Sequence, residues 1–177
     1  MNHKNTFKFA LLGATALTLV ACGEAKEEAL VYKSVEECVK AGEQDAAVCK
    51  AEFAKAEKLH TEVAPRYKSS NDCYSDFGYD RCRQYRTSSG TSMWLPFMVG
   101  YMLAPRIGGG SVYSQPLYRP ANDPNRYYTA RSGGIGRVGA NGRTQVAKAQ
   151  VSRPQARTRT VARGGFGARA AGRSSGG

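Results

Sequence analysis

The chain has 177 residues, of which 41% are hydrophobic and 23% charged, and its formal net charge is +12 at pH 7. This length excludes a large multidomain protein, and the chain's two apolar runs are both too short to cross a bilayer as a continuous helix. The charge is unevenly spread: +2 over residues 1–21, 11 basic against 13 acidic residues over 22–86, and 13 basic against one acidic residue over 87–177. We therefore expect a near-neutral module followed by a long cationic segment.

Residues 1–21 have the pattern of an export signal. Lys4 and Lys8 form a basic start, and Phe9 to Ala21 is an apolar run of secretory length. The sequence predicts that this segment is removed from the mature protein.

Leu19-Val20-Ala21-Cys22-Gly23 has the form of a bacterial lipobox. We expect Cys22 to be lipidated and to become the first mature residue, with residues 22–29 as a tether. Gly23, where an aspartate would indicate inner-membrane retention, favours the outer membrane, facing the periplasm. An ordinary signal peptide followed by a chance cysteine is the alternative.

Residues 30–86 hold the other four cysteines in two similar phrases. Tyr32 to Cys38 and Tyr67 to Cys73 repeat one pattern, and a second cysteine follows each phrase, at Cys49 and Cys82. In an exported chain an even number of cysteines predicts disulfides. The simplest pairing lies within each copy, but the other two connectivities stay open.

Helix signals accompany both copies. Ser34 with Glu37 fits a capping box, and Ser69 is in the same place in the second copy. Gly42 and Gly78 are expected to end two short helices. A longer amphipathic helix is predicted from about Asp45 to Val63.

The sequence gives only weak signals for a metal, redox or catalytic site in this module. Zinc and redox sites prefer closely spaced C-x-x-C pairs, which neither copy has. Asp72, Asp76 and Asp80 depart from calcium-loop spacing, so a solvated acidic face is expected. His60 is expected to be a packed or half-exposed core residue rather than a catalytic base.

Residues 93–105 form the most apolar stretch of the mature chain, with proline at 96 and 105. Three roles are open: packing on the cysteine module, which we favour, lying in a membrane interface, or contacting a partner. Trp94, Phe97 and Tyr101 are the candidate contact residues for the last two. A helix from Leu95 or Pro96 to Leu103 is expected.

Residues 106–177 are rich in Gly, Ala, Ser and Arg, and we expect this tail to be mostly disordered. Arg163-Gly164-Gly165-Phe166-Gly167 looks like an RGG segment, but the export signal argues against nucleic acid. Anionic lipid, lipopolysaccharide or an envelope protein is the expected partner, or the tail is only a solvated cationic segment. The candidate anion-contacting residues are Arg153, Arg157, Arg159, Arg163, Arg169 and Arg173.

The assembled pattern resembles the YgiB-like family of uncharacterised bacterial lipoproteins, a domain of unknown function. The resemblance is carried by Cys22, the two cysteine phrases, the block from Trp94 to Met102, Gln115 to Tyr118, and Thr160 to Gly167. It implies envelope placement and the cysteine framework. It brings no activity, substrate or catalytic residue.

We therefore expect a mainly α fold: a small disulfide-stapled helical module, an apolar docking segment and a long, largely disordered tail. The expected function is that of a non-enzymatic envelope lipoprotein with a structural or interaction role. No catalytic residue, metal or cofactor is predicted. The alternative is a thiol-active or accessory component of an envelope enzyme system.

Overall fold

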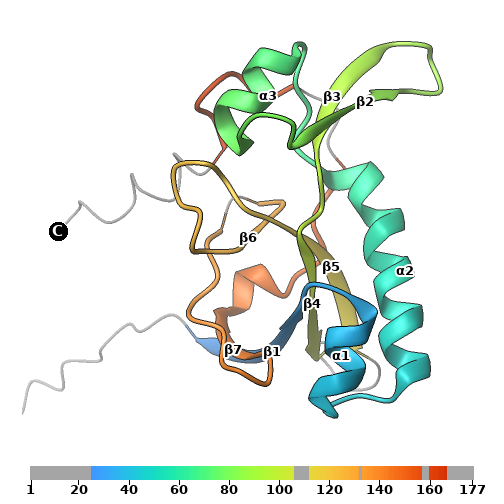
Figure 1. Ribbon diagram of the computed structural model, residues 1–177, viewed down its shortest axis with the longest axis vertical. Helices are drawn as coiled ribbons and strands as arrows, with labels where there is room; N and C mark the ends of the chain where they lie inside the picture. The colour runs from blue at the N-terminus through green and yellow to red at the C-terminus, as the bar shows by residue number, and fades with distance from the viewer. Residues whose placement is uncertain (1–24, 106–111, 132, 157–159, 167–177) are drawn as a thin grey trace, which may run out of the picture.

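The computed structural model describes residues 25–105, 112–131, 133–156 and 160–166. Most of its regular structure is β, in a five-stranded antiparallel sheet and a two-stranded hairpin, accompanied by three α-helices in the residues it describes (Figure 1). The expected mainly α fold is wrong. The three helices of residues 35–77 are where the sequence predicts them, but the helix expected from Leu95 or Pro96 to Leu103 is absent, and the sequence indicates none of the strands.

The five-stranded sheet has the order β6-β5-β4-β1-β7. Its strands are β1 (Lys26–Tyr32), β4 (Gly100–Pro105), β5 (Val112–Tyr118), β6 (Tyr128–Thr129) and β7 (Arg143–Ala147). All neighbours are antiparallel, and β1 pairs with β4 on one side and β7 on the other. A 3₁₀ turn, η1 (Lys148–Gln150), follows β7. β1 begins inside residues 22–29, which the sequence predicts to be a tether, so that boundary is also corrected.

The apolar stretch 93–105 is not helical. It contributes β3 (Ser92–Pro96), which pairs with β2 (Cys82–Arg86), and then β4. β4 is flanked by β1 and β5, and Tyr101 to Ala104 are buried in succession, so both of its faces are covered. A strand covered on both faces shows a continuous apolar run, which periodicity cannot distinguish from a buried helix. At Gly100 an added Cβ would lie 2.7 Å from the Tyr32 carbonyl oxygen, so a side chain there would push β4 away from β1.

The predicted disorder of residues 106–177 is wrong for most of the tail that the structure describes. β5, β6 and β7 all come from it. Its large side chains are few, but Leu117 and Tyr118 are fully buried, and Tyr128 and Phe166 join the same core cluster as Tyr118. These residues bury enough surface to order a chain whose average composition is polar.

The helices have the predicted ends. α1 (Val35–Ala41) and α3 (Ser70–Phe77) begin after Ser34 and Ser69, whose hydroxyls accept from backbone N–H groups at 3.3 and 3.1 Å. α2 (Ala46–Val63) begins after Asp45, although the Asp45 side chain makes no capping hydrogen bond. α2 lies against β5 and β4. α3 and the β2–β3 hairpin form the end of the molecule opposite the start of β1 (Figure 1).

The segment Arg163–Phe166 is bound to α3. The Asp76 carboxylate accepts from the backbone N–H groups of Gly164 at 2.7 Å and Phe166 at 3.3 Å, and from the Tyr67 hydroxyl at 2.7 Å. The Phe166 ring is 2% exposed and lies 4.9 Å from the ring of Phe77. The RGG-like motif thus has a structural role, because its glycine and phenylalanine N–H groups satisfy a buried carboxylate.

We expect Phe166→Ala to lower the free energy of unfolding by about 3 kcal/mol, because it empties a well-packed aromatic site. Phe97→Ala is the matched control, since the Phe97 ring is 46% exposed; it should cost less than about 1 kcal/mol. Denaturant unfolding of the two variants checks this. Equal losses would show that the Arg163–Phe166 segment does not pack on the core.

Candidate functional site

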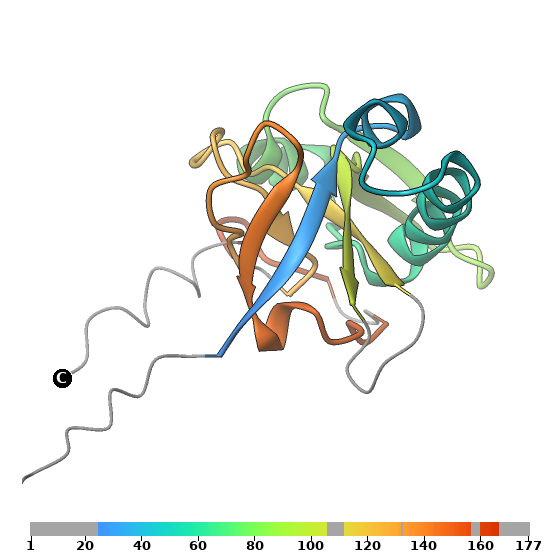
Figure 2. The ribbon, with the colours of Figure 1, turned by 90° about the horizontal axis from the view of Figure 1, so that it is seen from below.

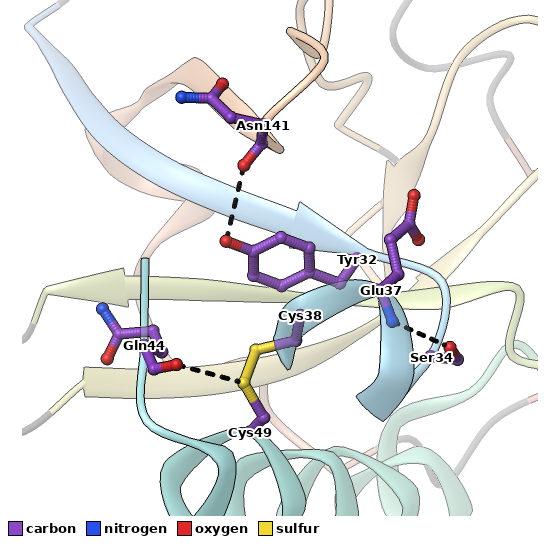
Figure 3. The surroundings of a disulfide bond; sticks show 7 residues. All are labelled: Tyr32, Ser34, Glu37, Cys38, Gln44, Cys49 and Asn141. Carbon is purple, nitrogen blue, oxygen red and sulfur yellow. Dashed lines mark hydrogen bonds between the residues drawn. A yellow bond between two sulfur atoms is a disulfide. The ribbon is translucent and has the colours of Figure 1, made fainter. Parts of the chain in front are cut away.

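Both disulfides have the within-copy pairing that the sequence favours. Cys38 bonds Cys49, and Cys73 bonds Cys82. All four residues are buried, with exposed fractions between 0 and 6%. Figure 3 shows the first bond between α1 and α2, beside Tyr32 of β1. Because the sulfurs are bonded and covered, these cysteines offer no thiolate for metal binding or thiol exchange.

The three candidate contact residues of the apolar stretch do not share one surface. Tyr101 is fully buried, and its ring lies 5.3 Å from that of Phe53. Trp94 is partly buried and makes edge contact with Tyr74 at 6.0 Å. Only Phe97 is exposed. Tyr101 and Leu103 lie in the same core cluster as Cys38 and Cys49, so these two residues pack on the cysteine module, the role that the sequence favours.

Two of the six candidate arginines lie in the part of the chain that the structure describes. Arg153 and Arg163 are both exposed, and Arg163 Nε donates to Ser75 Oγ at 2.9 Å. Cys22 and the other four arginines lie outside the described residues. These four are Arg157, Arg159, Arg169 and Arg173.

His60 is a core residue, as predicted. It is 5% exposed, and its Nδ1 lies 3.0 Å from the Tyr118 hydroxyl. Burial, with a smaller effect of the positive charge of Arg83, lowers the pKa of His60 to about 4. The imidazole is therefore neutral at neutral pH and is held by a structural hydrogen bond.

The aspartates of the second cysteine phrase do not converge. Asp72 bonds Ser69, Asp76 holds the Arg163–Phe166 segment, and Asp80 sits in a turn with φ 55°. Within the described ranges, no three or more His, Cys, Asp or Glu residues gather as metal ligands would.

The described structure has a cleft of about 710 Å³, which we name the β1 cleft. Its lining comes from the end of β1, α1, the segment between β5 and β6, and the turn before β7. Figure 2 shows the end of β1 beside α1 and this turn. Its lining residues are Val31, Tyr32, Lys33, Glu37, Lys40, Ala41, Arg119, Tyr127 and Val138 to Gly142.

The turn Gly139–Arg143 forms one wall of the β1 cleft and is held tightly. Gly142 O accepts from Val31 N–H at 2.9 Å, and Gly142 N–H donates to Gly139 O at 3.0 Å. Gly142 has φ +85°, and an added Cβ would lie 2.6 Å from the Tyr32 ring, so both conformation and space require glycine. The Tyr32 hydroxyl points to Asn141 O across this wall (Figure 3).

Arg143 ties the same turn to the N-terminal half. Its guanidinium bonds both carboxylate oxygens of Glu43, at 3.1 and 2.5 Å, and also bonds Glu28. The hydrogen bond from Arg143 lowers the pKa of Glu43. A cation of the basic half is thus neutralised by two acids of the near-neutral half, and the wall is fixed in place.

Arg119 is the most constrained cation of the β1 cleft. Its guanidinium carbon lies 4.6 Å from the centre of the Tyr127 ring. Its Nε is buried and has no hydrogen-bond acceptor among the residues that the structure describes. Lys33 and Lys40 add two exposed positive charges, against the single carboxylate of Glu37, whose Oε2 accepts from Lys33 N–H at 2.5 Å.

The sequence did not indicate this cleft. Its cations stand at positions 33, 40 and 119, and only the pairing of β1 with β4, and of β4 with β5, brings them together. The one local signal was the Gly139-Ala140-Asn141-Gly142 segment, which is typical of a turn but does not indicate what lies beside it.

Comparison with known proteins places the sequence of this chain in a family. Residues 26–177 match the family model described as "Protein of unknown function (DUF1190)". The chain belongs to this family. A UPF0441 protein of Klebsiella pneumoniae subsp. pneumoniae is 33% identical over 173 residues, covering 88% of this chain and 78% of that protein. One from Photorhabdus laumondii is 30% identical over 185 residues, covering 89% and 79%.

A Yersinia pestis UPF0441 protein is 30% identical over 187 residues, covering 94% of this chain and 82% of the relative. No solved structure matches the chain. None of the helices in the described ranges has the length and apolarity needed to span a membrane.

The buried His60 predicts a pH-dependent stability. Its pKa is about 4 in the folded chain against about 6.5 when unfolded. Between pH 6.5 and pH 4, His60 is protonated in the unfolded chain but neutral in the folded chain. The free energy of unfolding is therefore highest above pH 6.5 and falls as the pH drops below it. We expect a loss of about 2 kcal/mol between pH 7.5 and pH 5.

Urea unfolding at several pH values measures this loss. His60→Gln is the control, because its amide can still bond the Tyr118 hydroxyl but does not titrate. An unchanged pH slope in this variant would assign the loss to other groups.

Proposed function

We propose that the protein is a lipid-anchored component of the bacterial cell envelope that acts by binding rather than by catalysis. The observation that carries the proposal is the pair of buried disulfides in a chain whose residues 19–23 have the pattern of a lipobox. Disulfides persist in the oxidising periplasm and are rare in the cytosol. The export signal and the cysteine chemistry therefore agree on one compartment.

The distance from Cys22 to the fold supports an anchored arrangement. β1 begins at Lys26, four residues after Cys22, so even a fully extended tether spans only about 14 Å. A lipid on Cys22 would keep the start of β1 close to the membrane surface. In Figure 1, α3 and the β2–β3 hairpin, which carries Trp94, lie at the opposite end of the molecule. The ring of Phe97, the residue after β3, is exposed and is available for contact with a partner.

Binding is favoured over thiol chemistry by what the cysteines and histidine do in the structure. The four module cysteines are bonded and covered, and His60 is neutral and bonded to Tyr118. A thiol-active component would need an accessible thiolate. These side chains instead stabilise the fold.

The cationic half supports contact with anionic envelope material. Residues 87–177 carry 13 basic residues and one acid. Arg143 forms ion pairs with Glu28 and Glu43. Arg153 is exposed and has no ion pair with the described residues. Anionic lipid, lipopolysaccharide or an acidic envelope protein would complement this charge.

The anchor is tested by Cys22→Ser. We expect the native protein in the membrane fraction of the bacterium, with lipid on Cys22, and the variant as a soluble or unprocessed form. Fractionation with mass spectrometry of the N-terminus measures this. An unmodified Cys22 in cell-derived protein would refute the proposal.

Contact with anionic surfaces is tested by substitution, because deleting residues 131–177 would remove β7 from the sheet. Glutamine would replace Arg153, Arg157, Arg159, Arg169 and Arg173, whereas Arg163 is kept because it bonds Ser75. We expect binding to anionic vesicles at low salt to weaken at least tenfold, since each basic residue near such a surface contributes about 1 kcal/mol.

The matched control removes five exposed cations elsewhere in the fold and should bind nearly as well as the native protein. Its substitutions to glutamine are at Lys50, Lys58, Lys68, Arg86 and Arg126. Co-sedimentation at low and high salt compares the variants. Equal losses would mean that net charge alone drives binding, and the arginines of the tail would have no special part.

A further inference from the structure

We infer that the β1 cleft binds a soluble organic phosphomonoester. The inference rests on four features of the cleft: its size, its charge, the guanidinium of Arg119 stacked on Tyr127, and its place along β1. This inference rests on the proposed function, because the argument for a soluble ligand assumes the lipid anchor at Cys22.

The lining of the cleft is positively charged and therefore favours an anionic ligand. Lys33, Lys40 and Arg119 bring three positive charges, and Glu37 brings one negative charge. None of the three cations has an ion pair in the described part of the chain, whereas Arg143, just outside the lining, has two. The lining is therefore left with a charge of about +2, which a phosphomonoester of charge −1.5 to −2 complements better than a single carboxylate.

Arg119 supplies the directional part of the recognition. Its stacking on Tyr127, at 4.6 Å, fixes the plane of the guanidinium. The donors that a ligand in the cleft would meet are the two terminal nitrogens of this guanidinium, because its Nε is covered by protein atoms. A planar guanidinium held in this way can donate two parallel hydrogen bonds to phosphate oxygens.

The size and the remaining walls indicate an organic ligand rather than inorganic phosphate. The cleft volume of about 710 Å³ is within the range of about 300–1,000 Å³ that is usual for small-molecule sites. Val31, Ala41, Val138 and the Tyr127 ring give it apolar and aromatic walls. These suit the carbon skeleton of a small phosphorylated alcohol or sugar.

The place of the cleft along β1 favours a soluble ligand. β1 runs from Lys26, four residues after Cys22, to Tyr32, which lines the cleft. Six residue steps of a strand span about 20 Å, more than twice the screening length of about 8 Å at physiological salt. When β1 is directed away from the membrane, this distance keeps the headgroups of the anchoring membrane out of reach of the cleft.

The test is calorimetric titration of the purified full chain in a neutral detergent, with glycerol 3-phosphate as the probe. We expect saturable binding that Arg119→Gln weakens at least tenfold and Lys40→Gln about threefold. Glu37→Gln should tighten binding about twofold, because it removes the one opposing charge while keeping an acceptor for Lys33 N–H. Arg153→Gln is the matched control, with the same loss of charge outside the cleft, and should bind as the native chain does.

Each result of the titration supports or contradicts the inference. If the Arg119 and Lys40 variants, both checked for native unfolding temperature, bind as tightly as Arg153→Gln, the cleft is not the site. If glycerol 3-phosphate does not bind at millimolar concentration, the inference is overturned. Binding only to nanodiscs containing phosphatidic acid would overturn the soluble source. Failure of lipidation at Cys22 would refute the anchor while leaving the titration result in force, so the two proposals fail separately.

Discussion

The backbone pairing of β1 is the constraint on which the rest of the structure depends. β1 donates and accepts hydrogen bonds on both edges, to β4 on one side and β7 on the other, so the first strand of the described chain is interior to the sheet. The cysteine-rich helices follow β1 directly, and the strands from residues 100–147 surround it. A chain with two halves of very different composition thereby folds around one strand.

The opposite charges of the two halves are used to hold them together. Arg143 of the basic half bonds Glu28 and Glu43, and the N–H groups of Gly164 and Phe166 satisfy Asp76 of α3. These contacts are local and directional, unlike a general attraction between a cationic tail and an acidic module. They also consume acidic groups internally, which leaves other cations of the basic half, Arg119 among them, without an acidic partner in the described chain.

The sequence predicted the local features and missed the long-range ones. The caps at Ser34 and Ser69, the extent of α2 and the two disulfides each depend on residues within about a dozen positions, and all were confirmed. β1 and β7 are short, and each shows its alternation over only a few residues, so their pairing across more than 100 positions left no local signal. β4 shows no alternation because it is covered on both faces, and the tail looks disordered because a few large residues, Leu117, Tyr118 and Phe166 among them, order it.

The β1 cleft follows from the same long-range pairing. Gly142 must be glycine because the turn lies against Tyr32, and Arg143 then reaches Glu43 from the next position. Once that turn is fixed, it forms a wall against which ligand-sized space remains between β1, α1 and the segment carrying Arg119. A fold that needed this region only for packing would fill the space with apolar side chains. It instead keeps open a cleft lined by Lys33, Lys40 and Arg119, none of which has an ion pair in the described chain, and this arrangement supports binding as the role of the region.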